Sequence, residues 1–350
     1  MPLPACRTYL PPEWAPQSGV MLTWPHAGSD WAPILDEVEP VFVTIAAAIA
    51  RFEQVVIACH DAAVRARVAG LLRDARIPEA SVRLYIAPAD DTWARDHGPI
   101  TVLCREQATL LDFGFNGWGG KYPHELDNRI TRALHAQGAF GDTPIEHVDL
   151  ILEGGSIEVD GQGTLLTTER CLLAPTRNPR HARAQIEKQL AERLGVTRFL
   201  WLKNGYLAGD DTDSHIDTLA RLCDPDTIAY ITCDNPADEH YAELKAMEAE
   251  LTAFRTPAGQ PYRLVPLPWP SAKLDRDGTR LPATYANFLI LNGAVLVPTY
   301  RDPADEVALE CLRGCFPDRE VIGIDCLSLI AQHGSLHCVT MQIPAGVLPE

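Results

Sequence analysis

Apolar residues recur at helical spacing in six segments of the chain, and each segment is followed by a short run typical of a β-strand. The segments predicted as amphipathic helices are 36–52, 61–75, 125–137, 180–195, 237–254 and 302–316. The runs that follow them are QVVIAC, VRLYIA, IEHVDL, RFLWL, YRLVPLP and EVIGID. The sequence therefore repeats a helix-then-strand unit.

Pairs of apolar runs joined by polar or glycine-containing turns lie between these units and predict β-hairpins. They are GSIEVDGQGTLLTT, TLARLCDPDTIAYITC and NFLILNGAVLVPTY. A doubly wound sheet would not need a hairpin in every unit. The recurring order of hairpin, helix and strand predicts instead an α/β repeat that closes on itself, with helices outside and loops converging on one centre. No low-complexity linker divides the sequence, so we expect residues 1–350 to form a single domain.

The composition describes a chain that can bury a large core but carries an excess of acidic residues. Of the 350 residues 46% are hydrophobic, and the net charge is −17. Nucleic acid and anionic membranes are therefore unfavourable partners, because phosphate binding needs clustered Lys and Arg. A small cation would be attracted instead, although acidity also serves solubility alone.

Location and redox state are predicted from what the sequence lacks. No apolar run approaches the roughly 20 residues that span a bilayer, and the start of the sequence has no signal-peptide profile, which predicts a cytoplasmic protein. The ten cysteines are scattered without a C-x-x-C pair, which favours buried reduced thiols over disulfides or a structural zinc site. We expect no cofactor and no metal. The oligomeric state, including a homo-oligomer, is left open.

An unusual density of acids and one imidazole precedes an apolar run in GDDTDSHIDTLARL, residues 209–222. If this segment is a half-buried strand, His215 and Asp217 point to the same face. A solvated acidic turn with a structural histidine is an equally available interpretation. A hard-metal site at the preceding aspartates is another, but the calcium-loop pattern fails because its glycine and terminal glutamate are missing.

Two more carboxylates stand near the ends of predicted strands. Asp96 lies in DDTWARDHGPI, where a Gly-Pro pair forces a turn and the neighbouring Trp93 suits a flat cation. Glu153 ends the apolar run of LILEGGS, where Gly154 and Gly155 allow close backbone approach. Asp96 could also be a surface-turn residue. Glu153 is either exposed or buried against a cationic partner, because an unpaired buried charge is costly.

Cys338 differs from the other cysteines because it follows the polar, glycine-containing loop AQHGSLH. In an extended backbone His337 and Cys338 would point to opposite faces, so His215 is the better candidate for its base. One pocket walled by two tryptophans would then contain the candidate residues Asp96, Glu153, His215, Asp217 and Cys338, with Trp93 and Trp118 as walls.

Carboxylates crowded into one pocket repel each other unless a cation joins them. Guanidinium satisfies planar carboxylates best, because its five N–H donors have fixed directions. A thiol beside it could attack its central carbon. The predicted substrate is therefore a small cationic guanidine.

Seven motifs in order carry a family resemblance over about residues 10–345. They are TWPHAGSDW, DDTWARDHGPI, FGFNGWGGKY, LEGGSIEVDGQGTLLTTERCLL, GDDTDSHID, TYANFLILNGAVLVPTY and GSLHCVTMQIP. Together they resemble the agmatine deiminases, within the Porphyromonas-type peptidyl-arginine deiminase family. The resemblance implies the fold of the guanidine-modifying superfamily, a five-bladed α/β propeller of ββαβ units (the pentein fold). It also implies hydrolysis of agmatine to N-carbamoylputrescine and ammonia, a step toward putrescine.

The resemblance implies a role for each candidate. Cys338 matches the nucleophile and His215 the general acid/base; Asp96 and Asp217 match the carboxylates that grip the guanidinium. Glu153 matches the carboxylate that supports the general acid/base His215. Two departures are present: Glu158 stands where many relatives carry histidine, and HGSLHC replaces a loop richer in glycine.

Other classes remain to be separated from an agmatine deiminase. A deiminase of arginine or peptidyl-arginine performs the same chemistry on another substrate, and an amidinotransferase passes the amidino group to an amine. A metal-dependent hydrolase would use the Asp and His cluster as ligands. A guanidinium-binding protein would bind without turnover.

Overall fold

One strand pattern recurs in the computed structural model, which describes residues 8–105 and 107–349. In five of the described sheets an antiparallel pair of strands is joined by a third strand that is parallel to one of the pair. A helix connects the two parallel strands. In four of these sheets the antiparallel strands are consecutive in the chain, which is the predicted order of hairpin, helix and strand; in the fifth the pair joins the last strand to an early one. The α/β class built from ββαβ units is therefore confirmed.

The strands group by sheet as follows. The first contains β1 (Thr8–Tyr9), β5 (Ile100–Cys104), β6 (Gln107–Gly114) and β7 (Ile145–Ile151); the second β8 (Ile157–Val159), β9 (Thr164–Thr168) and β10 (Arg198–Leu202); the third β11 (Ala220–Asp224), β12 (Thr227–Ile231) and β13 (Arg263–Leu267). The fourth contains β16 (Leu289–Ile290), β17 (Ala294–Thr299) and β18 (Glu320–Asp325); the fifth β19 (Thr340–Pro344), β2 (Gln17–Thr23), β3 (Gln54–Cys59) and β4 (Val82–Ile86). A separate hairpin pairs β14 (Lys273–Leu274) with β15 (Arg280–Leu281).

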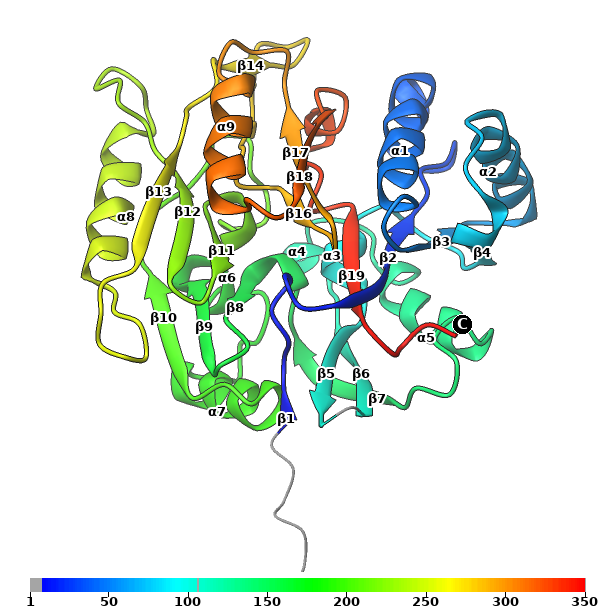
Figure 1. Ribbon diagram of the computed structural model, residues 1–350, viewed down its shortest axis with the longest axis horizontal. Coiled ribbons are helices and arrows are strands. Elements are labelled where there is room, and N and C mark those ends of the chain that lie inside the picture. Colours follow the sequence, from blue (N-terminus) through cyan, green and yellow to red (C-terminus); the bar gives the residue numbers. More distant parts are fainter. Residues whose placement is uncertain (1–7, 106, 350) are drawn as a thin grey trace, which may run out of the picture.

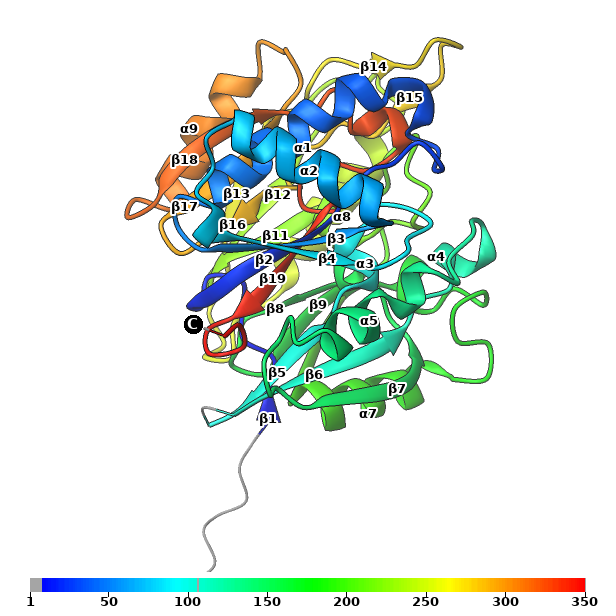
Figure 2. The ribbon, with the colours of Figure 1, turned by 90° about the vertical axis from the view of Figure 1, so that its right-hand side faces the viewer.

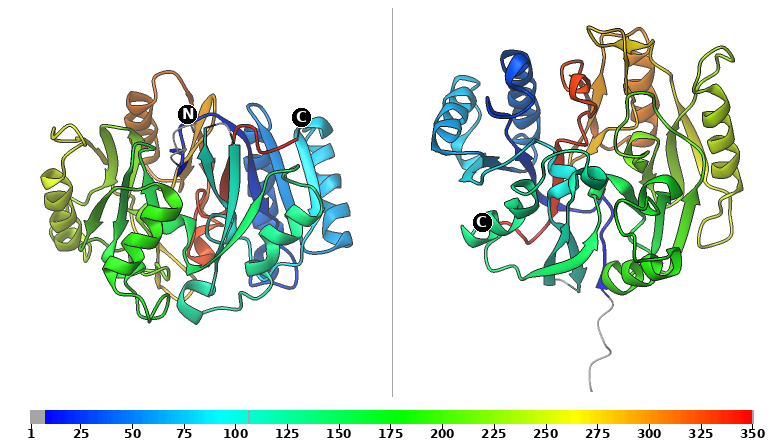
Figure 3. Two further views of the ribbon diagram at one scale, coloured as in Figure 1. Left: turned by 90° about the horizontal axis from the view of Figure 1, so that it is seen from below. Right: turned by 180° about the vertical axis from the view of Figure 1, so that it is seen from behind.

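All six predicted helices are present and differ from the prediction only at their ends. They are α1 (Leu35–Ile49), α2 (Ala62–Asp74), α5 (Ile130–Ala136), α7 (Arg183–Leu194), α8 (Tyr241–Ala253) and α9 (Asp305–Cys315). They lie at the periphery (Figures 1 and 3), and α1 and α2 cover one face of the β2–β3–β4 sheet (Figure 2).

The largest difference concerns the predicted helix 125–137, whose α-helical part begins only at Ile130. The preceding turn is the 3-10 helix η3 (Asp127–Arg129). The buried Asp127 carboxylate there accepts the backbone N–H of Asp90 at 2.7 Å and of Asp91 at 3.2 Å. This tertiary anchor outweighs the helical periodicity.

The last strand of the described chain, β19, lies in the same sheet as the early strand β2. β19 pairs antiparallel with β2, with Thr340 opposite Leu22 and Ile343 opposite Gly19. Such a pairing is what a closed ring of units requires; the closed five-bladed propeller itself stays a prediction, as does the single domain. Cys338 lies two residues before β19, so this sheet fixes where it sits.

The cysteine prediction holds for most of the described chain. Free thiols are present at Cys59, Cys171, Cys223, Cys233, Cys311, Cys315, Cys326 and Cys338. The prediction is wrong at Cys104, which is disulfide-bonded, because scatter along the sequence does not report proximity in space. Cys6 lies outside the described residues. Within 8–105 and 107–349, no helix combines the length and apolar character needed to cross a membrane.

Candidate active site

Short helical turns between the strands hold the candidate residues. α3 (Ala94–His97) carries Asp96, and the 3-10 helix η5 (Ile216–Thr218) carries Asp217. Glu153 directly precedes the 3-10 helix η4 (Gly154–Ser156), which packs against both α3 and η5. α3 also packs on β19, the strand that follows Cys338. Four distant parts of the chain therefore meet at one place.

His215 and Asp217 do not lie in a strand, because the strand of this segment, β11, starts only at Ala220. His215 lies in a loop before η5, and the preceding Asp213 and Ser214 have φ angles of 65° and 66°. The Asp210 carboxylate stabilises this left-handed backbone by accepting the Ser214 N–H at 2.7 Å. Part of the acidic cluster thus serves the loop that presents the imidazole.

Three of the candidate side chains converge over Gly155. A Cβ atom at this glycine would lie 2.6 Å from His215 Nδ1, 2.9 Å from Asp96 Oδ1 and 3.1 Å from Asp217 Oδ2. His215 Nδ1 and Asp96 Oδ1 are themselves 3.6 Å apart. Any larger residue at position 155 would push into this cluster, so the glycine is required by the close approach.

Asp96 is held by donors on both of its oxygens. The Trp118 indole N–H donates to Oδ2 at 2.9 Å, and the Gly155 N–H donates to Oδ1 at 3.1 Å. Burial raises the pKa of Asp96 to about 6, against the opposing effect of His215. Trp118 therefore does more than form a wall, since it fixes the carboxylate. The Trp93 ring packs edge-on against the Trp118 ring, with their centroids 6.4 Å apart.

Cys338 lines the same pocket as Asp96, Trp93 and Trp118 and is buried. Its Sγ donates to the side-chain oxygen of Asn287 at 3.3 Å. Burial raises the pKa of the Cys338 thiol well above its usual value, and the Asp217 and Asp96 carboxylates add to the effect. These surroundings favour the protonated thiol over the thiolate.

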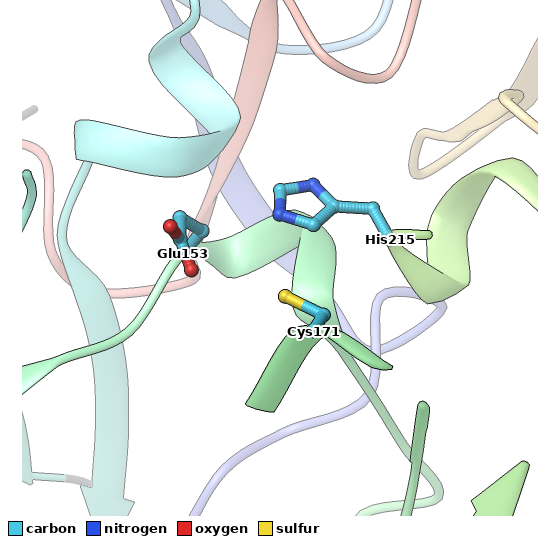
Figure 4. A group of neighbouring side chains, drawn as sticks. All are labelled: Glu153, Cys171 and His215. Carbon is cyan, nitrogen blue, oxygen red and sulfur yellow. The ribbon is translucent and has the colours of Figure 1, made fainter. Parts of the chain in front are cut away.

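Glu153 is buried against a cationic partner, the second of the two predicted alternatives. Arg177 Nε donates to Glu153 Oε1 at 3.0 Å, whereas Oε2 has no hydrogen-bond partner among the described residues. Figure 4 shows the Glu153 carboxylate, the Cys171 thiol and the His215 ring gathered around one space. Burial lowers the pKa of His215, but Asp96, followed by Cys171 and Glu153, raises it well above its usual value.

Glu153, Cys171 and His215 also form a group that could hold a metal ion, because their ligand atoms lie within 4.8 Å of one another. Two features oppose this use. The Arg177 guanidinium already neutralises Glu153. Burial also raises the pKa of the Cys171 thiol, whereas a metal ligand must be the thiolate. We therefore keep the expectation that no metal takes part.

Two site residues were missed or left without a role by sequence reasoning. Asn287 accepts from Cys338 Sγ and donates through Nδ2 to the Asp217 backbone oxygen at 3.3 Å, so it ties nucleophile to carboxylate. A polar residue inside the apolar run TYANFLIL must find buried partners, and that signal could have identified it. Arg177, in TRNPR, gives no comparable local signal because its partner is 24 residues away.

A fold of ββαβ units around a buried thiol, an imidazole and several carboxylates defines the class of guanidine-modifying α/β proteins. More specifically, the chain belongs to the Porphyromonas-type peptidyl-arginine deiminase family, whose sequence profile matches residues 9–344.

Known proteins resemble the chain over nearly their full length. An agmatine deiminase of Stutzerimonas stutzeri is 34% identical, covering 96% of this chain and 95% of that protein. The crystal structure of a Porphyromonas gingivalis protein, named as a candidate arginine deiminase, is 55% identical with a TM-score of 0.92, covering 98% of this chain and 100% of that chain. A cysteine-to-serine variant of C. jejuni agmatine deiminase with substrate bound is 35% identical with a TM-score of 0.91, covering 99% of each chain.

Proposed function

We propose that the protein is an agmatine deiminase, a hydrolase that converts agmatine to N-carbamoylputrescine and ammonia on the route to putrescine. One observation carries this proposal: the carboxylates of Asp96 and Asp217 and the ring of His215 converge over Gly155, and Asp96 lines one pocket together with Cys338. The names of the relatives support the same reaction.

The guanidinium is held by Asp96 and Asp217 through charge-assisted hydrogen bonds. Asp217 Oδ1 is buried and, within the described part of the chain, has no hydrogen-bond partner. An unpaired buried carboxylate oxygen is costly, so a donor from the ligand is expected there. Trp93 and Trp118 supply the flat walls that suit a planar cation.

The reaction proceeds through a covalent intermediate. Cys338 releases its proton to solvent as the cationic substrate binds, and the thiolate adds to the central carbon, forming a C–S bond while the C=N π electrons move onto nitrogen. His215 donates a proton to the departing nitrogen, the C–N bond breaks and ammonia leaves, so an amidino-thioether remains. Neutral His215 then takes a proton from water. The hydroxide adds to the carbon, the electron pair of the C–S bond returns to sulfur, the sulfur takes up the hydroxyl proton of the adduct, and N-carbamoylputrescine leaves with the Cys338 thiol restored.

The substrate's own charge is proposed to generate the thiolate, because the surrounding carboxylates otherwise hold the Cys338 proton. The measurement is the pH dependence of Cys338 alkylation with and without a non-reactive guanidinium ligand, corrected for physical blocking. We expect the ligand to lower the apparent pKa of the thiol. An unchanged pKa would reject this step.

The pocket favours agmatine over arginine. Four further carboxylates line it: Asp30, Asp91, Asp210 and Asp211. Agmatine ends in a second cation that these groups attract, whereas free arginine carries a carboxylate that they repel. A peptidyl-arginine substrate would also have to bring a polypeptide into this acidic pocket.

A substrate panel with ammonia detection tests the function. The panel contains agmatine, arginine and blocked arginine peptides, and it is run beside Cys338→Ala. We expect turnover of agmatine that survives exhaustive chelation and needs no acceptor amine. Agmatine turnover by Cys338→Ala, or loss of activity on chelation, would overturn the mechanism. Preferred turnover of arginine would replace the substrate.

Three accompanying expectations belong to this proposal. The chain acts as a single catalytic domain, works in the cytoplasm, and needs no cofactor. Free thiols at eight of the described cysteines support a reducing compartment, whereas the disulfide at Cys104 opposes it. Size-exclusion chromatography with light scattering would settle whether the protein forms a homo-oligomer.

A further inference from the structure

A second buried histidine borders the site and has no role in the mechanism above. His337 is the chain neighbour of Cys338 and is 2% exposed. Its Nδ1 lies 2.7 Å from Asp217 Oδ2, and its Nε2 lies 2.6 Å from Glu13 Oε2. A neutral imidazole has one N–H and could donate to only one of these carboxylates. Both short contacts together fit an imidazolium that donates twice.

With His337 as an imidazolium, the positive and negative charges of the surrounding buried residues balance. Glu13 Oε2 also lies 3.1 Å from Arg221 Nη2 and 3.4 Å from Arg95 Nη2. Arg221 in turn contacts the buried Glu158. Three carboxylates are thus matched by two guanidinium groups and one imidazolium. Buried charges persist when they are paired in this way, so the cluster is a closed ionic network.

This network holds one side of the substrate carboxylate. His337 occupies Asp217 Oδ2, which leaves the unpartnered Oδ1 for a ligand. The His337 backbone is fixed as well, because its N–H donates to Asn287 Oδ1 at 2.9 Å. Burial raises the pKa of Asp217, but the hydrogen bond from His337 brings it below its usual value. Asp217 is therefore kept ionised and oriented before any substrate arrives.

We propose that His337 is a positioning residue, a buried imidazolium clamped by Glu13 that fixes and ionises Asp217 for the substrate guanidinium. The proposal rests on the proposed function, because it assigns Asp217 to the substrate. It explains why Glu13, in the segment YLPPEW, lies beside the nucleophile loop although the two are more than 300 residues apart in sequence.

Two isosteric substitutions at His337 separate its contacts. The amide nitrogen of His337→Asn can replace Nδ1 and keep a neutral donor to Asp217, whereas that of His337→Gln replaces Nε2 and reaches toward Glu13. We expect agmatine affinity at neutral pH to fall about 10- to 100-fold in His337→Gln, the range lost when a group that orients a metal ligand is removed. His337→Asn should recover part of this loss.

The pH dependence distinguishes positioning from a structural effect. The charged groups facing Asp217 are His337, His215, Arg221 and Arg95, which favour its ionised form, and Asp96, which opposes it as a Cys338 thiolate would. Removing the His337 charge raises the pKa of Asp217, so binding should weaken as pH falls through a higher value than in the wild type. Agmatine affinity is measured by calorimetry in a Cys338→Ala background, where turnover cannot interfere.

His240→Asn is the matched control. His240 is likewise buried, with Nδ1 2.7 Å from Asp238, and it accepts the Ala208 N–H at 2.8 Å. It does not line the pocket of Cys338. We expect lower thermal stability with an unchanged pH profile of binding. The positioning role is overturned if His337→Gln weakens agmatine binding by the same factor at every pH. It is also overturned if this variant, like the control, lowers thermal stability without changing agmatine binding.

Neutron diffraction from crystals of the wild-type protein tests the proposal without any variant or substrate. Hydrogens on both ring nitrogens of His337 are expected. A nitrogen without a hydrogen would overturn the imidazolium, even if agmatine is hydrolysed. Conversely, a doubly protonated His337 in a protein that does not bind agmatine would refute the proposed substrate and leave the ionic network in place.

Discussion

His215 and His337 are buried equally well near the same aspartate, yet their surroundings differ in kind. Among residues 8–105 and 107–349, no hydrogen bond reaches either ring nitrogen of His215, although the Cys171 thiol lies within 4.8 Å. Both nitrogens of His337 lie within 2.7 Å of a carboxylate oxygen. Burial alone therefore says nothing about which imidazole can react.

The difference separates the site into a reacting side and a supporting side. Unsatisfied buried groups cost free energy, and the reacting side holds several of them, at Glu153 Oε2, Asp217 Oδ1 and the His215 ring. On the supporting side Arg221 Nη2 also lacks a hydrogen bond among the described residues, but it is paired in charge with Glu13 at 3.1 Å. The supporting side, around His337 and Glu13, forms a paired ionic network that rigidifies its members. A substrate that supplies N–H donors would complete the reacting side and leave the supporting side unchanged.

Substitution of His215 should give the largest effect, because it removes the proton donor. We expect His215→Gln to lower kcat for agmatine about 10³-fold with little change in KM. Thermal stability should fall only slightly, since the removed ring has no hydrogen bond within the described chain and loses the charge pairing with Asp96 Oδ1 at 3.6 Å. Steady-state ammonia release and thermal unfolding measure both. A loss confined to KM would place His215 on the supporting side.

Glu13→Gln should affect folding instead. It removes the carboxylate shared by His337, Arg221 and Arg95, and uncompensated buried cations destabilise a protein by about 3 kcal/mol. Urea unfolding measures the free energy. Glu320→Gln is the control, because Glu320 pairs with Arg51 at the exposed surface and should contribute within about 1 kcal/mol. Equal effects of the two variants would contradict a buried network.

The reacting side should show its own pH dependence through Asp96. Its folded-state pKa is raised to about 6, so it becomes neutral as pH falls through that value and no longer attracts the guanidinium. We expect kcat/KM for agmatine to fall about tenfold per pH unit below this point. The measurement is a pH profile of kcat/KM. A flat profile from pH 5 to 7 would mean that Asp96 does not need to be ionised.

Trp118→Phe should give the smallest effect. It removes the indole N–H that donates to Asp96 Oδ2 at 2.9 Å, a hydrogen bond to a charged group of about 1.5 kcal/mol. The pKa of Asp96 should rise, and the acid limb of the same profile should move up by roughly one pH unit. Trp269→Phe is the control, because its indole donates to Asp238 rather than to the pocket. If the acid limb of the kcat/KM profile moved equally in both variants, the shift could not be assigned to the hydrogen bond between Trp118 and Asp96.

Much of the fold could be predicted because it depends on local patterns. The periodicity of 180–195 and the following RFLWL identified α7 and β10 without knowledge of their partners. The acids of the site were identified because carboxylates at the ends of apolar runs are conspicuous. Their convergence over Gly155 is a property of the whole chain, and the sequence anticipated it only as the hypothesis of one shared pocket and through the family resemblance.

The rest depended on backbone geometry that the sequence does not display. Alternation along SHIDTL predicted a strand, but the left-handed Asp213 and Ser214 turn the chain into η5. The same assumption of extended backbone set His337 aside, whereas it lies in a turn with Cys338 and points to Asp217. The contact between Glu13 and His337 spans 324 residues, which no local pattern reports.

The pairing of β19 with β2 has a consequence for biosynthesis. A ribosome makes the N-terminal strand long before it makes the nucleophile, so a nascent chain carries most of its acidic pocket without a reactive thiol. Catalysis can begin only when the last strand docks beside one of the first. Enzymatic turnover would thus report that translation has reached β19 and that folding has paired it with β2.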